Sequence, residues 1–277
     1  MALTEAAPTS FHSWFEAGLH AKARRDWDRC RAWNSRALEL FGDPESEEFG
    51  GANPAAWNLG IAATALGDWD TARRAWTVYG IGGLEDGTGP IDGNFGLAPI
   101  RLNPDRPSLD LEVPARYGDT EVVWCWRRSP AHAVVASVPL PQSGHRFRDV
   151  ILHDGEPKGS RRTGDQEVSV FDEIVRLCES GMPTWQAQVS APSLAEVETV
   201  GDFFGERGLG ADNWSGMNIL CSDCSHGSPS ADHHNEKPSD GTMILGLAGH
   251  EDDLARALEM WTAARPGVSV LALDLIW

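Results

Sequence analysis

A cluster of thiols and imidazoles near the C-terminus is the strongest chemical signal in the sequence. Cys221 and Cys224 form a C-x-x-C pair, and His226, His233 and His234 follow in the same polar stretch. Two thiolates at this spacing can bind one metal ion, and histidine nitrogens can complete a tetrahedral ligand set. We therefore predict a zinc site, structural rather than catalytic, because a long loop without apolar anchors gains order from a cross-link. The alternatives are a redox pair of cysteines and a polar loop whose thiols are incidental.

A second group of polar residues, in the middle of the chain, could perform acid–base chemistry. If residues 149–153 form a strand, Asp149 and His153 project from one face, so the carboxylate could orient the imidazole as a base. Neighbouring arginines could grip an anion. The alternative is a polar rim that hydrogen-bonds nearby loops, and the lack of a nucleophile motif such as G-x-S-x-G favours it. The candidate catalytic residues are His145, Asp149, His153 and Asp154, and the candidate binding residues are Arg146 and Arg148.

The elements around the Cys/His loop alternate between strand and helix. Ser193 is a candidate N-cap, and Glu196 would close a capping box at the start of the first helix. The order β-α-β, loop, β-α-β resembles the ferredoxin-like split βαβ sandwich, a fold that hosts many unrelated functions. The expected strands are 184–190, 217–221, 242–248 and 268–277, and the helices begin near 193 and 254.

The middle of the chain reads as short strands joined by turns. Apolar, β-branched and aromatic residues dominate the segments EVVWCWRR, HAVVASVPL, RDVILHD and EVSVFDEIV. We predict a compact antiparallel sheet or small barrel over residues 121–182. The Gly- and Pro-rich residues 81–120 lack clear periodicity and are expected to form an irregular connector.

The N-terminal region carries helical periodicity over residues 11–41 and 54–79. Asn53 and Pro54 suit an N-cap and a first helical position. Gly67 and Asp68 suit a left-handed turn followed by the next N-cap.

The second of these segments resembles the tetratricopeptide repeat. It reads Trp57-Asn58-Leu59-Gly60, then Gly67-Asp68-Trp69, then Ala72 and Trp76, and the first segment aligns Ala17-Gly18, Asp26-Trp27, Cys30 and Trp33 with it. The resemblance implies paired helices in which a small residue lets the second helix approach, with residues 42–51 inserted between the two units. It also implies either a surface able to bind a protein or peptide, or a purely structural scaffold. The domains expected are therefore 1–80 helical, 81–120 connector, 121–182 β-rich, and 183–277 α/β with the Cys/His loop, in an α+β protein.

Acidity limits the partners that the chain can attract. The formal net charge is −18, and residues 181–277 hold 4 Lys/Arg against 14 Asp/Glu. Such a chain repels phosphate backbones and anionic lipid, so nucleic-acid and membrane binding are not expected. A basic protein partner would be attracted. The alternative is that the acidity only maintains solubility. The absence of a secretory signal at the start and the five cysteines predict a cytoplasmic protein with reduced or metal-bound thiols.

These observations favour a protein-binding adaptor or inhibitor, for example an immunity-type protein that neutralises a basic toxin. The alternative is a metal-dependent enzyme that uses either the Cys/His loop or the segment from His145 to Asp154. A third hypothesis is a small-ligand sensor in which the ferredoxin-like sheet forms a pocket wall.

Overall fold

The computed structural model describes residues 2–104, 120–163, 166–216 and 242–277. Within these ranges the chain is a mixed α+β protein, as the sequence predicts. It divides into two compact units, Met1–Phe95 with Arg127–His132, and Gly96–Trp126 with Ala133–Trp277. Among the described residues, no helix combines the length and the apolar character that a membrane span needs.

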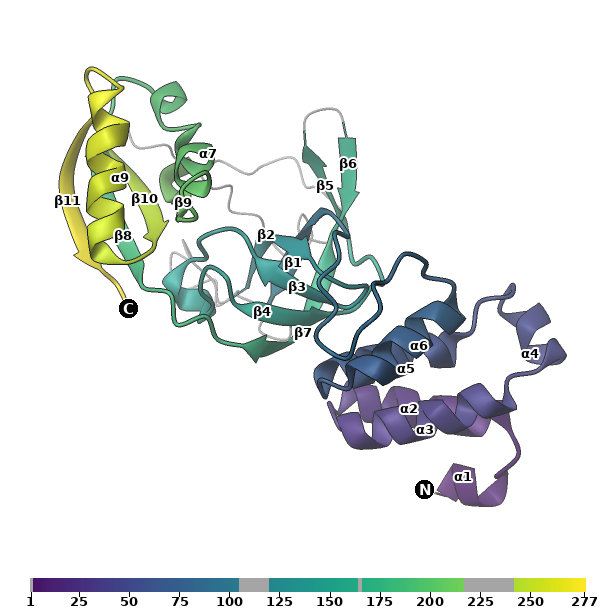
Figure 1. Ribbon diagram of the computed structural model, residues 1–277. Coiled ribbons are helices and arrows are strands. Elements are labelled where there is room, and N and C mark those ends of the chain that lie inside the picture. The colour runs from purple at the N-terminus through teal and green to yellow at the C-terminus, as the bar shows by residue number, and fades with distance from the viewer. Residues whose placement is uncertain (1, 105–119, 164–165, 217–241) are drawn as a thin grey trace, which may run out of the picture. The chain divides into compact units, whose positions relative to one another are not determined.

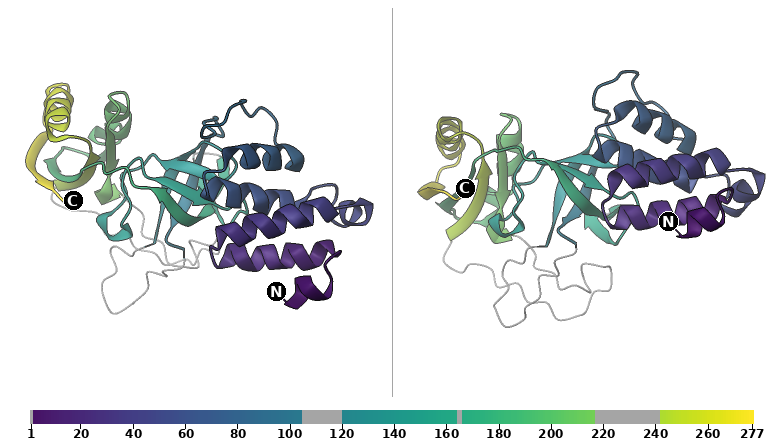
Figure 2. Two further views of the ribbon diagram at one scale, coloured as in Figure 1. Left: turned by 60° about the horizontal axis from the view of Figure 1, so that its bottom comes forward. Right: turned by 90° about the horizontal axis from the view of Figure 1, so that it is seen from below.

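The first unit is built on two helical hairpins that lie side by side (Figures 1 and 2). Helix α2 packs on α3, α5 packs on α6, and α3 packs on α5. The caps are those expected from the sequence: Asn53 Oδ1 accepts hydrogen bonds from the first turn of α5, and Asp68 caps α6 after Gly67 in the left-handed region (φ 68°). The helices are α1 (Ala2–Ala6), α2 (Phe11–Ala23), α3 (Trp27–Leu40), α4 (Asp43–Glu48), α5 (Pro54–Ala65) and α6 (Trp69–Tyr79).

A glycine on the first helix of each hairpin allows the second helix to approach closely. A Cβ at Gly60 would lie 2.6 Å from ring atoms of Trp76, and one at Gly18 would lie 2.4 Å from the amide of Asn34. Asn34 and Trp76 therefore hold equivalent positions. The sequence alignment that pairs Trp33 with Trp76 is off by one residue, because it follows the aromatic side chain instead of the spacing from the glycine.

Five strands close into a barrel in the order β1-β2-β3-β4-β7 (Figure 1). The barrel confirms the predicted small β structure, but β1 lies in the segment expected to be an irregular connector. Its residues are buried at nearly every position and include Pro99, so it shows neither alternation nor an uninterrupted strand pattern. Its parallel pairing with β7, where Ile100 lies opposite Phe171, closes the barrel. The barrel strands are β1 (Leu97–Leu102), β2 (Glu121–Arg127), β3 (His132–Val135), β4 (Val150–His153) and β7 (Phe171–Cys178), and β5 (Ser160–Thr163) with β6 (Gln166–Ser169) forms a separate hairpin.

The C-terminal part of the second unit is a four-stranded sheet in the order β11-β8-β10-β9, with every neighbouring pair antiparallel. Helices α7 and α9 cover one face of it (Figure 2), and Phe204 and Trp261 are fully buried in the core between them and the strands. The elements are β8 (Thr184–Ser190), α7 (Val200–Gly205), β9 (Gly210–Asn213), β10 (Thr242–Ala248), α9 (Glu251–Ala263) and β11 (Ser269–Leu275).

One expectation for this region needs correction. The helix expected after Ser193 starts instead at Val200, behind a single 3-10 turn, and Ser193 makes no side-chain capping bond. Strand β9 pairs with Leu245–Ala248 of β10. The expected strand 217–221 lies outside the described residues.

Candidate functional site

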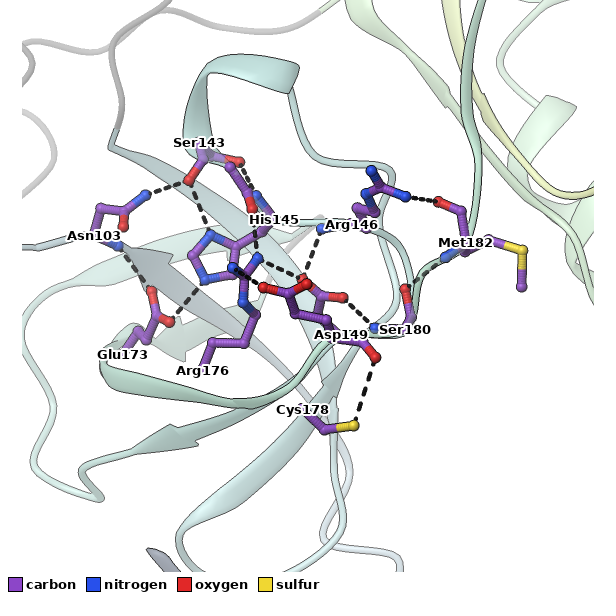
Figure 3. A network of polar contacts seen from close by, with 12 residues as sticks. Asn103, Ser143, His145, Arg146, Asp149, Glu173, Arg176, Cys178, Ser180 and Met182 are labelled. Carbon is purple, nitrogen blue, oxygen red and sulfur yellow. Dashed lines mark hydrogen bonds and ion pairs between the residues drawn. The ribbon is translucent and has the colours of Figure 1, made fainter. Parts of the chain in front are cut away.

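A buried polar network lies at the end of the barrel where β1 ends and β2 begins (Figure 3). Asn103 directly follows β1, and Glu173 lies on β7. His145 follows a short 3-10 turn, Pro141–Ser143, which ends at Gly144 in the left-handed region (φ 73°). His145 is 5% exposed and Glu173 is 6% exposed, so their polar atoms depend on one another and on the surrounding backbone.

Both ring nitrogens of His145 face acceptors. Nε2 lies 2.8 Å from Glu173 Oε1, and Nδ1 lies 3.1 Å from the carbonyl oxygen of Ser143. The other oxygen of Glu173 accepts the backbone N–H of Asn103 at 2.9 Å. Because a carbonyl can only accept, Nδ1 carries a proton. The geometry is that of an imidazolium between a carboxylate and a carbonyl.

The electrostatics agree with this assignment. Burial alone would lower the pKa of His145, but the hydrogen bond and negative charge of Glu173, together with the Ser143 carbonyl, outweigh it and raise the pKa above its usual value. A general base needs a nitrogen able to take up a proton, and a metal ligand needs a nitrogen lone pair. His145 offers neither while this ion pair is intact.

Asp149 is the second anchor of the network and is fully buried. Its carboxylate accepts the backbone N–H groups of Arg146 at 3.0 Å and Ser180 at 2.8 Å, and a guanidinium nitrogen of Arg176 at 3.2 Å. Arg176 also donates to the carbonyl oxygen of Gly144 at 2.5 Å. These contacts tie the turn before β4 to the end of β7, a structural task.

The other two candidate catalytic residues, His153 and Asp154, lie at the end of β4 and directly after it. Asp149 precedes β4, and His153 ends it, with a register shift between Leu152 and His153 in the pairing with β7. The buried ring of His153 lies 5.6 Å from that of Phe171, and its Nδ1 lies 3.0 Å from the carbonyl oxygen of Asp154. The structure therefore places His145 and Asp149 in one network, and His153 beside an aromatic ring and its own neighbour.

The two candidate anion-binding arginines contact backbone carbonyls and aromatic rings. The guanidinium of Arg146 lies 3.5 Å from the carbonyl oxygen of Met182 and 4.6 Å from the ring centroid of Trp277. That of Arg148 donates to the carbonyl oxygen of Gly208 at 2.9 Å. Neither contact forms the paired fork that grips a carboxylate or phosphate.

Two further acidic residues, which were not predicted from the sequence, accept backbone hydrogen bonds from residues 138–140, the segment before this network. Glu121 Oε1 accepts the N–H of Leu140 at 2.9 Å, and Asp212 accepts the N–H of Val138. Burial raises the pKa of Glu121 to about 7 and that of Asp212 to about 6, in each case against the lowering effect of these hydrogen bonds. No local pattern could reveal them, because each acid meets its donor only in the folded chain.

A second buried histidine, also missed, lies in the first unit. His132 Nδ1 lies 2.6 Å from the hydroxyl oxygen of Ser129, which accepts the N–H groups of Ala131 and His132. The ring lies 5.2 Å from that of Trp69. Burial lowers the pKa of His132 to about 4. A serine beside a histidine can form a nucleophile pair, but Ser129 is fully buried, so a substrate cannot reach it.

The predicted metal ligands Cys221, Cys224, His226, His233 and His234 lie outside the described residues. Within the described ranges, no group of three or more His, Cys, Asp and Glu side chains is placed to hold a metal ion. The zinc site therefore stays a prediction from the sequence.

No protein-family model matches the chain, and no curated protein matches it. One solved structure, a hypothetical protein from Neisseria gonorrhoeae, aligns with 63% of this chain and 91% of its own, at 12% sequence identity and a TM-score of 0.23. A likeness this weak carries no argument about fold or function.

Proposed function

We propose that this chain is a protein-binding adaptor or inhibitor whose helical unit engages a basic segment of a partner protein. The stacked hairpins, with their glycine contacts and caps, support the resemblance to tetratricopeptide repeats. An immunity-type role is one form of this proposal. The cytoplasm is the proposed location, and it is compatible with Cys30, Cys125 and Cys178, which form no disulfide among the described residues.

The central helix of the stack does not supply the binding surface. Helix α5 is buried from Ala55 to Thr64 at every position except Trp57, which is half-buried. A helix that is apolar all round is a core helix. A partner must therefore use other surfaces of the unit, and the exposed charges are the first choice.

The main observation behind the proposal is helix α4, which lies between the two hairpins in the sequence. It reads Asp-Pro-Glu-Ser-Glu-Glu and contains no basic residue. Glu45 caps its own helix through the N–H of Gly42, whereas Asp43, Glu47 and Glu48 are exposed. A cluster of exposed carboxylates on a chain with a net charge of −18 steers a basic partner and speeds its association.

The chemistry of the barrel network also favours binding over catalysis. The polar atoms of His145, Glu173 and Asp149 are held by backbone groups and by one another. Such a network stabilises one arrangement of the loops.

The proposal is tested by capturing partners from a lysate with the full-length chain and with the triple variant Asp43→Asn/Glu47→Gln/Glu48→Gln. We expect the variant to lose most of the captured basic protein, and the wild-type complex to weaken as salt is raised. The matched control, Glu85→Gln/Asp86→Asn/Glu167→Gln, removes the same charge from exposed positions outside α4 and outside the C-terminal sheet, and should capture as the wild type does. Equal capture by all three proteins would refute a role for α4, and no capture at low salt would refute the binding proposal.

Two finer assignments belong to the same proposal. The sheet order β11-β8-β10-β9 with both helices on one face supports the ferredoxin-like interpretation of the C-terminal part, which would supply rigidity or a second surface.

Structural zinc at Cys221 and Cys224 is tested by elemental analysis of the chain and of the variant Cys221→Ser/Cys224→Ser. One equivalent of zinc that disappears in the variant would support it, and metal-free wild-type protein would refute it.

A further inference from the structure

Strand β11 is an apolar edge of the C-terminal sheet. It pairs with β8 on one side, and among the described strands it is the last in the sheet order on the other side. Large apolar side chains are exposed along it: Leu271 is 55% exposed and Leu275 57%, and Ile276 just beyond the strand is 38% exposed. An edge strand presents backbone N–H and C=O groups to any chain that can align with it.

Strand β11 has few of the features that usually stop an edge strand from pairing with another chain. Proteins protect such edges with lysine, proline or inward-pointing charges, but residues 269–277 contain no Lys, Arg or Pro, and Asp274 is their one charged side chain. A register shift between Val270 and Ala272 bends the first part of the strand. From Ala272 to Leu275 the pairing with β8 is regular, so the outer edge of this stretch is straight enough to pair again.

Alternation divides the side chains of this stretch between two faces. Leu273 packs partly against the core beneath the helices, and Leu275 shares its face, whereas Asp274 points to the other. A strand added at this edge would meet apolar side chains on one face and a carboxylate on the other. It would fit best if its own residues alternated between apolar and basic.

The charge of the surrounding sheet and helices points to the same partner. Among the described residues from Thr184 onward, the basic side chains are Arg207, Arg256 and Arg265, and each is already engaged, by Glu206, by Asp253, and by Thr199 respectively. The acidic residues of this part are Glu196, Glu198, Asp202, Glu206, Asp212, Glu251, Asp252, Asp253, Glu259 and Asp274. A second copy of the chain would bring the same negative charge to the edge, whereas a basic segment would be attracted.

We propose that β11 accepts an extended segment of a partner protein, in which apolar residues alternate with Lys or Arg, as a fifth strand of the sheet. Backbone hydrogen bonds supply affinity, and the alternation supplies specificity. The site uses none of the residues of α4, so it can stand if the function proposed for the helical unit fails, and the reverse also holds.

The probe is a short end-blocked peptide in which valine alternates with lysine, added to the full-length chain. Hydrogen exchange should show new protection of alternate backbone amides of β11, and calorimetry should show binding that weakens with salt. The same peptide with a central proline should lose binding, because proline cannot donate a hydrogen bond to a sheet. A valine–glutamate peptide should not bind.

The variant Asp274→Lys changes an exposed side chain without touching the core. It should lower the affinity for the valine–lysine peptide about tenfold, because a lysine at position 274 repels that peptide. It should raise the affinity for the valine–glutamate peptide, which the new lysine attracts. Equal binding by wild type and variant, or binding that survives the central proline, would overturn the proposal. Full protection of the outer β11 amides in the free protein would also overturn it, because a second copy or another part of the chain would then already occupy the edge; sedimentation would tell these apart.

Discussion

His132 and His145 are both buried, yet their surroundings shift their pKa values in opposite directions. His132 faces a serine hydroxyl, and burial lowers its pKa to about 4, so the ring is neutral. His145 faces the carboxylate of Glu173 and the carbonyl of Ser143, which raise its pKa despite burial. The comparison teaches that burial does not decide the charge of a histidine. The acceptors that the fold supplies decide it.

The two histidines make opposite contributions to stability as pH changes. The folded pKa of His132 lies below its usual 6.5, so its contribution is lost as pH falls from about 6.5 towards 4. The folded pKa of His145 is raised, so its contribution is fully present below 6.5 and is lost as pH rises through the folded value. As pH falls, the region around His132 should therefore lose stability first. As pH rises, the region around His145 should lose stability first.

The largest effect is expected from His145→Ala. The change leaves the Glu173 carboxylate buried with the Asn103 N–H but without its counter-charge, and breaking a buried ion pair costs about 3–5 kcal/mol. Urea unfolding of the full chain at pH 6, followed by amide exchange in the barrel, measures this loss.

The control for that variant removes both charges. His145→Leu/Glu173→Leu should be less destabilised than the sum of the single changes, because no unpaired charge remains. If the two single changes were additive, the ion pair assigned to this network would not exist.

Ser129→Ala should have the next largest effect. It removes the acceptor of two backbone N–H groups and the partner of the His132 ring, and unsatisfied buried groups cost about 1–3 kcal/mol. Because the ring is neutral, this loss should be nearly constant from pH 6 to pH 8. A loss that changed strongly over that range would show that His132 is charged, and the comparison would fail.

Glu121→Gln should stabilise the barrel at alkaline pH, the reverse of an ordinary polar deletion. The amide oxygen can still accept the Leu140 N–H, but it carries no charge to bury. The folded pKa of Glu121 is about 7, against 4.5 in the unfolded chain. The free energy of unfolding therefore falls as pH rises from 4.5 to 7. The variant should gain about 1–3 kcal/mol at pH 8 and nothing near pH 4. Unfolding curves at both pH values decide this, and a gain at pH 4 alone would contradict the assignment.

Local signals in the sequence predicted α2, α3, α5, α6, α9 and most strands, because each depends on neighbouring residues, but they did not predict α1 and α4. The Asn53–Pro54 and Gly67–Asp68 signals place two helix starts correctly. The alignment at Trp33 failed, since the contact with the glycine is set by helical spacing and not by aromatic character. The Ser193 cap failed because a suitable cap does not compel the chain to begin a helix there.

The site was harder to predict because its essential partners are distant in sequence. His145 and Asp149 could be named as polar candidates, but Glu173 and Asn103 come from β7 and the end of β1, which meet only when the barrel closes. The parallel pairing of β1 with β7 leaves no short-range pattern. Whether His145 is a base or an ion-pair partner therefore depends on topology that the sequence does not display.

The smallest effect, and the most direct test of the comparison, is a shift of resonances without any change in stability. In a histidine titration by NMR, the His132 ring should stay in its neutral position until pH approaches 4, whereas His145 should remain in the imidazolium position above pH 6.5. His145→Gln and His132→Gln identify the two signals. If Glu173→Gln moved the His145 midpoint downward and left that of His132 unchanged, the acceptor would be the cause of the difference. If both histidines titrated together near 6.5, burial and partners would have no influence, and the opposite pH responses predicted for the two regions would fall with them.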